Sequence, residues 1–175
     1  MVNREQIKSA IDQPNFKDEK ITLFQTAGDI IKELKRAELE SRPTSKKLAR
    51  VFNEEDKMKV AAKVWYFLRN QIFYEAEPKT SQNAKTINRF IYDATGDCKH
   101  FAVFSVGVLN ACGVPCWFTF IGQQKNTKRP NHAYATALIN GQNVVIDPCR
   151  KYFNSEAKYF YKWDIARINK KVNNN

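Results

Sequence analysis

The sequence predicts a single α+β domain in which helices come first and an antiparallel sheet follows. Through residues 24–72, apolar residues recur at spacings of three and four, the period of a helix. After Pro115 the pattern changes to short alternating or continuous apolar segments, which are typical of strands. Two of these segments are separated by Asn140-Gly141, the dipeptide that most strongly indicates a two-residue β-hairpin.

Three helices are expected in the first half of the chain. Residues 3–13 read as a short helix, residues 24–41 as a second and residues 53–72 as a third, with a short turn within residues 44–52. The third is the clearest, because Asn53 and the three acidic residues after it suit the positive end of a helix dipole.

Two more helices are expected before the sheet. Residues 81–92 read as a short one, and an apolar segment without proline predicts another from Cys98 to Ala111. This second helix ends at Cys112-Gly113-Val114-Pro115, since glycine accepts the left-handed conformation of a helix stop and proline prevents continuation. Residues 158–168 are expected to add a closing strand or helix.

Strands are expected over residues 116–122, 132–139 and 143–147. With Asn140-Gly141 as the turn, the register makes His132 and Asp147 diagonal neighbours on one face of the sheet. The opposite face is apolar, as a core-facing side should be, and consists of Ala133, Ala135, Ala137, Ile139, Val144 and Ile146.

The composition is that of a globular protein, since hydrophobic residues make up 43% and charged residues 27% of the 175 residues. No apolar run approaches the roughly 20 residues that a membrane helix needs. The N-terminus lacks the apolar region of a secretory signal. We therefore expect a cytoplasmic or otherwise leaderless protein, a virion component included, with no membrane span.

Four cysteines are too few for a disulfide scaffold and are expected to be thiols: Cys98, Cys112, Cys116 and Cys149. They include no CxxC pair, and neither histidine stands at zinc-finger spacing from a second cysteine. A structural zinc site is therefore not expected. We expect neither a metal nor an organic cofactor.

The net charge of +11 lies mostly in the second half, where residues 98–175 carry 11 basic and 3 acidic groups. A basic surface attracts nucleic acid, anionic lipid or acidic substrates. No RRM, KH or zinc-finger pattern accompanies the charge, so we do not expect a nucleic-acid partner. The loop 123–131 carries Lys125, Lys128 and Arg129 and suits either an acidic substrate or simple solvation.

Cys98 is the candidate nucleophile. It falls in the first turn of a predicted helix, where unpaired N–H groups and the helix dipole favour a thiolate and can stabilise an oxyanion. Cys112 lies at the negative end of the same helix and reads as a small buried hydrophobe. His100 stands two residues from Cys98, and such pairs point to nearly opposite sides of a helix, so it is a poor base.

His132 is the remaining histidine, and Asp147 is placed to orient it. Taken singly, an aspartate before a proline is more often a turn residue, and a histidine at a strand start is more often a polar edge residue. Taken together with Cys98, the two complete the arrangement of a cysteine nucleophile, its base and the residue that orients the base.

These residues resemble the transglutaminase-like superfamily of papain-like thiol enzymes. The resemblance lies in GDCKHFAVFSVGVLNACGVPC, NHAYATAL and NVVIDP, preceded by the helix AAKVWYFLRNQIFY, and covers residues 58–149. It implies a papain-like core with the cysteine helix packed on an antiparallel sheet. It also makes Cys98 the nucleophile, His132 the general base and acid, and Asp147 the residue that orients His132.

The same resemblance sets expectations for the rest of the chain. Residues 58–175 should form the catalytic core and residues 1–57 a helical extension packed on it, within one compact domain. Members usually carry an aromatic residue soon after the histidine, here Tyr134. A side-chain oxyanion donor has no firm counterpart, and Trp65, Tyr66 and Tyr74 are the candidates. Candidate substrate-binding residues are therefore Trp65, Tyr74 and Tyr134.

The sequence leaves two functions open. The first is a thiol enzyme that acts on an amide or peptide bond of a protein or peptide through a Cys98 thioester. Hydrolysis is favoured over transamidation, because many small members of the superfamily are regarded as hydrolases. The second is a non-catalytic structural or binding component of a larger assembly, for example a virus particle, with residues 1–57 as the contact surface.

Overall fold

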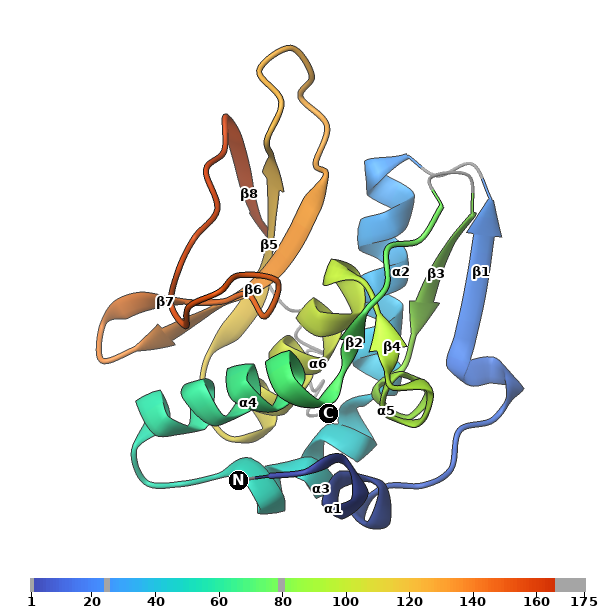
Figure 1. Cartoon of the computed structure of the whole chain (residues 1–175), viewed down its shortest axis with the longest axis vertical. Helices are drawn as coiled ribbons and strands as arrows, with labels where there is room; N and C mark the ends of the chain where they lie inside the picture. The colour runs from blue at the N-terminus through green and yellow to red at the C-terminus, as the bar shows by residue number, and fades with distance from the viewer. Residues whose placement is uncertain (1, 24–25, 79–80, 166–175) are drawn as a thin grey trace, which may run out of the picture.

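The computed structural model describes residues 2–23, 26–78 and 81–165. A four-stranded sheet stands on one side of the molecule and a two-stranded ladder on the other, with helices between and below them (Figure 1). Helices dominate the first half of the chain and the antiparallel sheet the second, which confirms the predicted α+β class.

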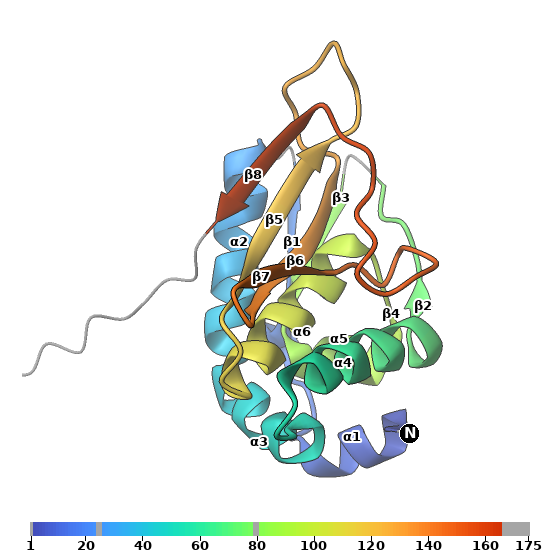
Figure 2. The ribbon, with the colours of Figure 1, turned by 90° about the vertical axis from the view of Figure 1, so that its left-hand side faces the viewer.

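The larger sheet has the strand order β7-β6-β5-β8, and all its neighbouring strands are antiparallel. Figure 2 shows it in front of the helices. The three strands predicted from the sequence are confirmed as β5 (Cys116–Gly122), β6 (His132–Ile139) and β7 (Gln142–Ile146). The C-terminal segment adds β8 (Tyr161–Ile165) beside β5, and its last residues, 166–168, lie outside the described part of the chain.

The hairpin between β6 and β7 has the predicted register, with Ile139 paired to Gln142 and Ala135 paired to Ile146. Asn140 and Gly141 have φ values of 52° and 77°, the left-handed conformation that a type I′ turn requires at both positions. The predicted apolar face is buried in the main core, as shown by Ala133, Ala135, Ala137, Ile139, Val144 and Ile146.

Helix α6 (Cys98–Ala111) has the predicted bounds, and its residues from Lys99 to Leu109 are all buried. One side packs against β5 and β6, and the other sides contact α2 (Ala27–Glu40), α3 (Arg42–Phe52) and α4 (Lys57–Gln71). A side chain at Gly107 would meet Ser45, since a Cβ there would lie 2.7 Å from Ser45 Oγ. The absence of a side chain at this position thus lets α3 approach α6.

Helix starts in the first half differ from the prediction where a cap decides the boundary. Helix α2 begins at Ala27, after the capping residue Thr26, and Phe24 lies outside the described residues. Helix α4 begins at Lys57 rather than at Asn53, because the Asp56 carboxylate accepts hydrogen bonds from the next N–H groups of the first turn.

Helix α3 occupies residues where a short turn was predicted. Pro43, which was read as a stop, lies in its first turn, where proline costs no hydrogen bond. Helix α1 (Arg4–Ala10) is short as predicted. Buried side chains of these helices join the core that surrounds α6, among them Ile7, Leu34 and Leu48.

Two small ladders complete the fold. The antiparallel pair joins β1 (Glu19–Leu23), which follows a 3-10 turn (Phe16–Asp18), to β3 (Ser81–Lys85). The predicted helix over residues 81–92 is thus wrong in its first part, and only α5 (Ile87–Asp93) is helical there. A two-residue parallel ladder links β2 (Phe73–Tyr74), after α4, to β4 (Thr95–Gly96), just before α6.

The hairpin turn gives a first testable prediction. Gly141→Val is expected to lower the free energy of unfolding by about 1–2 kcal/mol, because a β-branched residue is strained at positive φ. No atom lies within 4 Å of the added Cβ, so the loss would come from the backbone conformation alone. The measurement is urea unfolding, with Gly28→Ala in α2 as the control that should change stability by less. Equal effects of the two substitutions would contradict the assignment.

Candidate active site

Helix α6 begins at a closed, buried cap. The Asp97 carboxylate accepts a hydrogen bond from the Lys99 backbone N–H at 3.0 Å, and His100 Nδ1 accepts one from the Asp97 N–H at 3.1 Å. The Asp97 side chain also accepts from the backbone of His100, which completes a capping box around the first helical residue, Cys98. The cap needs a glycine before it, since a Cβ at Gly96 would lie 2.9 Å from His100 Nδ1.

The Lys99 side chain extends this cap into a buried charge network. Its ammonium group donates to Gln82 Oε1 at 2.8 Å and to Glu77 Oε2 at 3.2 Å, and it pairs with the Asp97 carboxylate. Burial alone would lower the pKa of Lys99, but Asp97 and Glu77 raise it. Burial alone would likewise raise the pKa of Asp97, but His100 and Lys99 lower it to about 2. Asp97 and Lys99 are therefore both charged at neutral pH.

His100 supports the helix start and does not face Cys98 as a base. Its ring is fully buried, and Nδ1 is engaged by the backbone of Asp97. Its Nε2 lies 3.9 Å from Glu77 Oε1. Ligand atoms of Glu77, Asp97 and His100 lie within 4.8 Å of one another, but the Lys99 ammonium already contacts two of these three side chains.

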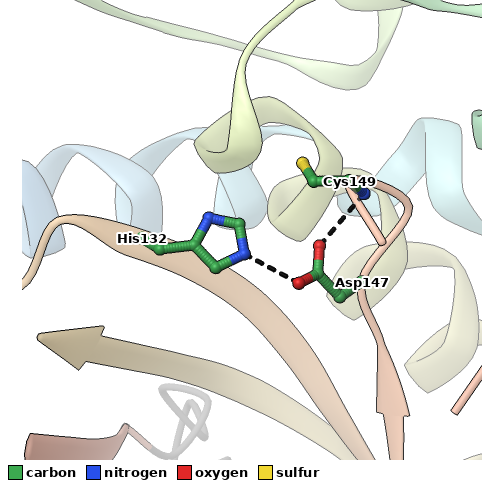
Figure 3. Close-up of side chains that lie close together, drawn as sticks. All are labelled: His132, Asp147 and Cys149. Carbon is green, nitrogen blue, oxygen red and sulfur yellow. Dashed lines mark hydrogen bonds and ion pairs between the residues drawn. The ribbon is translucent and has the colours of Figure 1, made fainter. Parts of the chain in front are cut away.

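His132 and Asp147 meet as the hairpin register predicted. His132 Nε2 lies 2.7 Å from Asp147 Oδ2 (Figure 3). The Asp147 side chain is 1% exposed and that of His132 is 12% exposed, so the hydrogen bond is shielded from water. The carboxylate fixes the orientation of the imidazole ring, as in other histidine-dependent sites.

The other side of His132 faces Cys98. Burial would lower the pKa of His132, but hydrogen bonds to Asp147 and Cys98, together with their negative charge, raise it to about 10. Because Nε2 is engaged by Asp147, Nδ1 is the nitrogen left for Cys98. His132 is thus an imidazolium at neutral pH, and it lies between the Asp147 carboxylate and the Cys98 sulfur.

Asp147 is held from α4, a relationship that the sequence analysis missed. Trp65 Nε1 donates to the Asp147 carbonyl at 2.9 Å, and Arg69 donates to the Pro148 carbonyl at 3.2 Å. The Cys149 N–H donates to Asp147 Oδ1 at 3.1 Å. The only sequence signal for this contact was a tryptophan on the apolar face of a predicted helix. A buried indole N–H needs a hydrogen-bond acceptor, so such a tryptophan indicates an acceptor nearby.

Two of the three predicted substrate-binding residues are not accessible. Trp65 is 3% exposed and its N–H is engaged by Asp147, and Tyr134 is 1% exposed with its hydroxyl donating to Glu156. Both side chains support the site from inside. The prediction of substrate contact is therefore corrected for Trp65 and Tyr134, which leaves Tyr74.

Tyr74 is 55% exposed and lies beside the site. Burial of its hydroxyl raises the pKa of Tyr74 to about 12, and the charges of Cys98 and Cys149 act in the same direction. Its ring stacks on Phe101 at a centroid distance of 6.3 Å. A cleft of about 270 Å³ adjoins it, lined by residues 68–74, Phe101 and Pro148.

Cys112 differs from Cys98 as predicted. It follows the last turn of α6 and is 4% exposed. Burial raises the pKa of Cys112 to about 11, and the nearby Lys57 and Lys63 offset this only in part. Cys112 is therefore a protonated core residue at neutral pH.

The comparisons with known proteins identify the family. The model of the transglutaminase-like superfamily matches residues 46–148, which is more than half of the chain. The chain therefore belongs to the transglutaminase-like superfamily, and this membership supports a cysteine-dependent enzyme. No curated protein sequence matched the chain.

Solved structures share the fold at low sequence identity. A candidate protease from Parabacteroides distasonis has a TM-score of 0.56 and 15% identity, over 71% of this chain and 27% of that one. A candidate cysteine protease from Cytophaga hutchinsonii has a TM-score of 0.50 and 20% identity, over 75% of this chain and 49% of that one. LapG of Legionella pneumophila has a TM-score of 0.47 and 20% identity, over 75% of this chain and 77% of that one. The chain thus spans about a quarter and about half of the length of the first two proteins.

Among the helices that the structure describes, none combines the length and the apolar character that a membrane crossing requires.

The buried network gives the second prediction. Lys99→Met is expected to lower the free energy of unfolding by about 3–5 kcal/mol, because it leaves the carboxylates of Asp97 and Glu77 buried without their cation. The measurement is urea unfolding at pH 7. Lys128→Met, in the exposed loop, is the matched control and should change stability by no more than about 0.5 kcal/mol. A Lys99→Met protein as stable as the control would mean that the network contributes nothing to stability.

Proposed function

We propose that this protein is a thiol hydrolase that cleaves an amide or peptide bond through a thioester on Cys98. The observation that carries the proposal is the position of the His132 imidazolium, with Asp147 bonded to one ring nitrogen and Cys98 facing the other. An imidazolium beside the sulfur favours the thiolate, the nucleophilic form of cysteine.

In the first half of the reaction, the Cys98 thiolate attacks the carbonyl carbon and a carbon–sulfur bond forms. The negative charge moves to the carbonyl oxygen, and the backbone N–H of Cys98 at the positive end of α6 is placed to stabilise it. His132 then donates its proton to the leaving nitrogen as the carbon–nitrogen bond breaks. The products are a free amine and a thioester on Cys98.

In the second half, neutral His132 takes a proton from water, and the resulting hydroxide attacks the thioester carbonyl. The carbon–sulfur bond breaks, the carboxylic acid leaves, and the proton on His132 restores the imidazolium–thiolate pair. Asp147 keeps its hydrogen bond to Nε2 in both halves and so holds the ring in one orientation. If an amine replaced water in this half, the same site would carry out transamidation.

The cleft beside Tyr74 supports a protein or peptide substrate. An extended chain that places a carbonyl at Cys98 would pass the exposed ring of Tyr74 and the groove that ends at Pro148. An exposed aromatic ring beside a groove is suited to apolar side chains of a peptide. Tyr74 is therefore the substrate-contacting residue of this proposal.

The third prediction concerns the reactivity of Cys98. In the wild-type protein at pH 7, iodoacetamide should alkylate Cys98 at least about tenfold faster than Cys112, because an ordinary thiol is only a few per cent thiolate at this pH. His132→Gln should slow alkylation of Cys98 by about tenfold and leave Cys112 unchanged. Peptide mass spectrometry measures both sites in the same sample. Equal rates at the two cysteines would overturn the activated thiol.

The fourth prediction separates hydrolysis from transamidation. Wild-type protein incubated with fluorescein-labelled casein and biotinylated cadaverine should release labelled fragments, with little biotin incorporated. Cys98→Ala should abolish both signals while the protein stays folded by circular dichroism. Biotin incorporation without fragments would assign transamidation, and fragments of equal yield from Cys98→Ala would refute the catalytic role of Cys98. A site that neither cleaves nor transfers would favour the alternative, a binding component of a larger assembly.

A further inference from the structure

The short strand β2 has one paired edge and one open edge. In the described structure it pairs with β4 alone. Phe73 N–H donates to the Ala94 carbonyl at 2.8 Å, and Glu75 N–H donates to the Gly96 carbonyl at 2.9 Å. Because the main-chain groups of successive strand residues point to opposite sides, the N–H and C=O of Tyr74 face away from β4. Within the described part of the chain, no hydrogen bond engages them there.

This open edge lies beside the nucleophile. Tyr74 is aligned with Gly96 of β4, which precedes Cys98 by two residues (Figure 1). The Tyr74 ring also stacks on Phe101 of α6, with the ring planes 6° apart. Phe101 follows Cys98 by three residues, so the two side chains share one face of the helix. The main chain of Tyr74 is therefore held next to the start of α6 from two sides.

The cleft at the site runs along β2 rather than along β4. Its lining includes residues 72–74, Phe101 and Pro148, but neither residue of β4. Pro148 follows Asp147 directly, so it brings the cleft to the segment that orients His132. A chain that lay in this cleft would have the open edge of β2 on one side and the Asp147 segment on the other.

An open strand edge selects its ligand by main-chain geometry. It binds an extended chain through N–H and C=O groups, which nearly every residue of a polypeptide carries. In a folded protein those groups are already bonded within helices and sheets. A small amide lacks the run of main-chain groups that a strand offers. The edge therefore suits a polypeptide segment that has no secondary structure of its own.

We propose that the substrate is an unfolded segment of a protein, which adds to the open edge of β2 as a further strand and pairs with the main chain of Tyr74. The Tyr74 N–H donates one hydrogen bond to this segment and its C=O accepts one. Main-chain pairing tolerates many side chains, so the unfolded state of the substrate, more than its sequence, should decide where the protein acts. That cleavage follows the pairing rests on the proposed function, whereas the pairing can be tested without catalysis.

Amide exchange tests the pairing in a protein that cannot react. Full-length Cys98→Ala protein is mixed with reduced, carboxymethylated ribonuclease A, and hydrogen exchange is followed by NMR. The unfolded chain should slow exchange of the Tyr74 amide at least about tenfold. The Phe73 amide, already bonded to Ala94, should change little. Native ribonuclease A has the same sequence in a folded state and should protect neither amide.

Two results of this experiment would overturn the proposal. One is a Tyr74 amide that exchanges equally fast with and without the unfolded chain, up to the solubility limit of that chain. The other is equal protection by native and unfolded ribonuclease A, because the edge would then not distinguish a folded from an unfolded partner.

A pair of variants separates the main chain of Tyr74 from its ring. Tyr74→Pro removes the N–H without breaking a bond to β4, whereas Tyr74→Ala removes the ring and keeps the N–H. With fluorescein-labelled casein, kcat/KM of Tyr74→Pro should lie at least about tenfold below that of Tyr74→Ala, mainly through a higher KM. Equal values in two variants that are folded by circular dichroism would refute the pairing. If Tyr74→Pro does not fold, the amide-exchange result decides.

The failure of this inference and the failure of the proposed function give different results. Protection of the Tyr74 amide by the unfolded chain, without cleavage of casein by the wild-type protein, would refute the hydrolase and support the pairing. Cleavage of casein by the wild-type protein, without protection of the Tyr74 amide, would support the hydrolase and refute the pairing.

Discussion

The buried ammonium group of Lys99 is the constraint on which the site depends, because it holds the Asp97 carboxylate that caps α6. It joins the carboxylate that caps the helix to Glu77 and Gln82, which lie earlier in the chain. The beginning of α6 in turn determines the position of Cys98 and the direction in which the first N–H groups point. A cysteine one turn further along would lose both the helix dipole and its contact with His132.

The site combines residues from different parts of the chain. The nucleophile comes from a buried helix, and the base and its orienting carboxylate come from one hairpin. The orienting residue is supported by Trp65 of α4, 82 residues away in the sequence. Helices of the first 57 residues bury side chains in the same core, so removing them would expose the face on which α6 packs. A binding role for those helices is therefore best examined with surface substitutions rather than by truncation.

The hairpin and the pairing of His132 with Asp147 could be predicted because they follow from local rules, namely a two-residue turn and the alternation of strand side chains. The bounds of α6 could be predicted in the same way, because Asp97 and Gly113 mark its two ends in the sequence. Strand β3 could not be predicted, because its polar residues form a strand only by pairing with β1, about 60 residues earlier. The inward roles of Trp65 and Tyr134 also depend on distant acceptors, and spacing alone does not show which aromatic residues remain exposed.

The two-residue turn between β6 and β7 has a consequence for which parts of the site are positioned together. The ladder pairs residues 135–139 with residues 142–146, and His132 and Asp147 lie just beyond its end, where they are joined by their own hydrogen bond. Cys98 belongs to a different element, and its distance to His132 depends on how α6 sits against the sheet. The position of the base relative to its carboxylate is thus set within one hairpin, whereas its position relative to the nucleophile is set by the packing of α6 on the sheet.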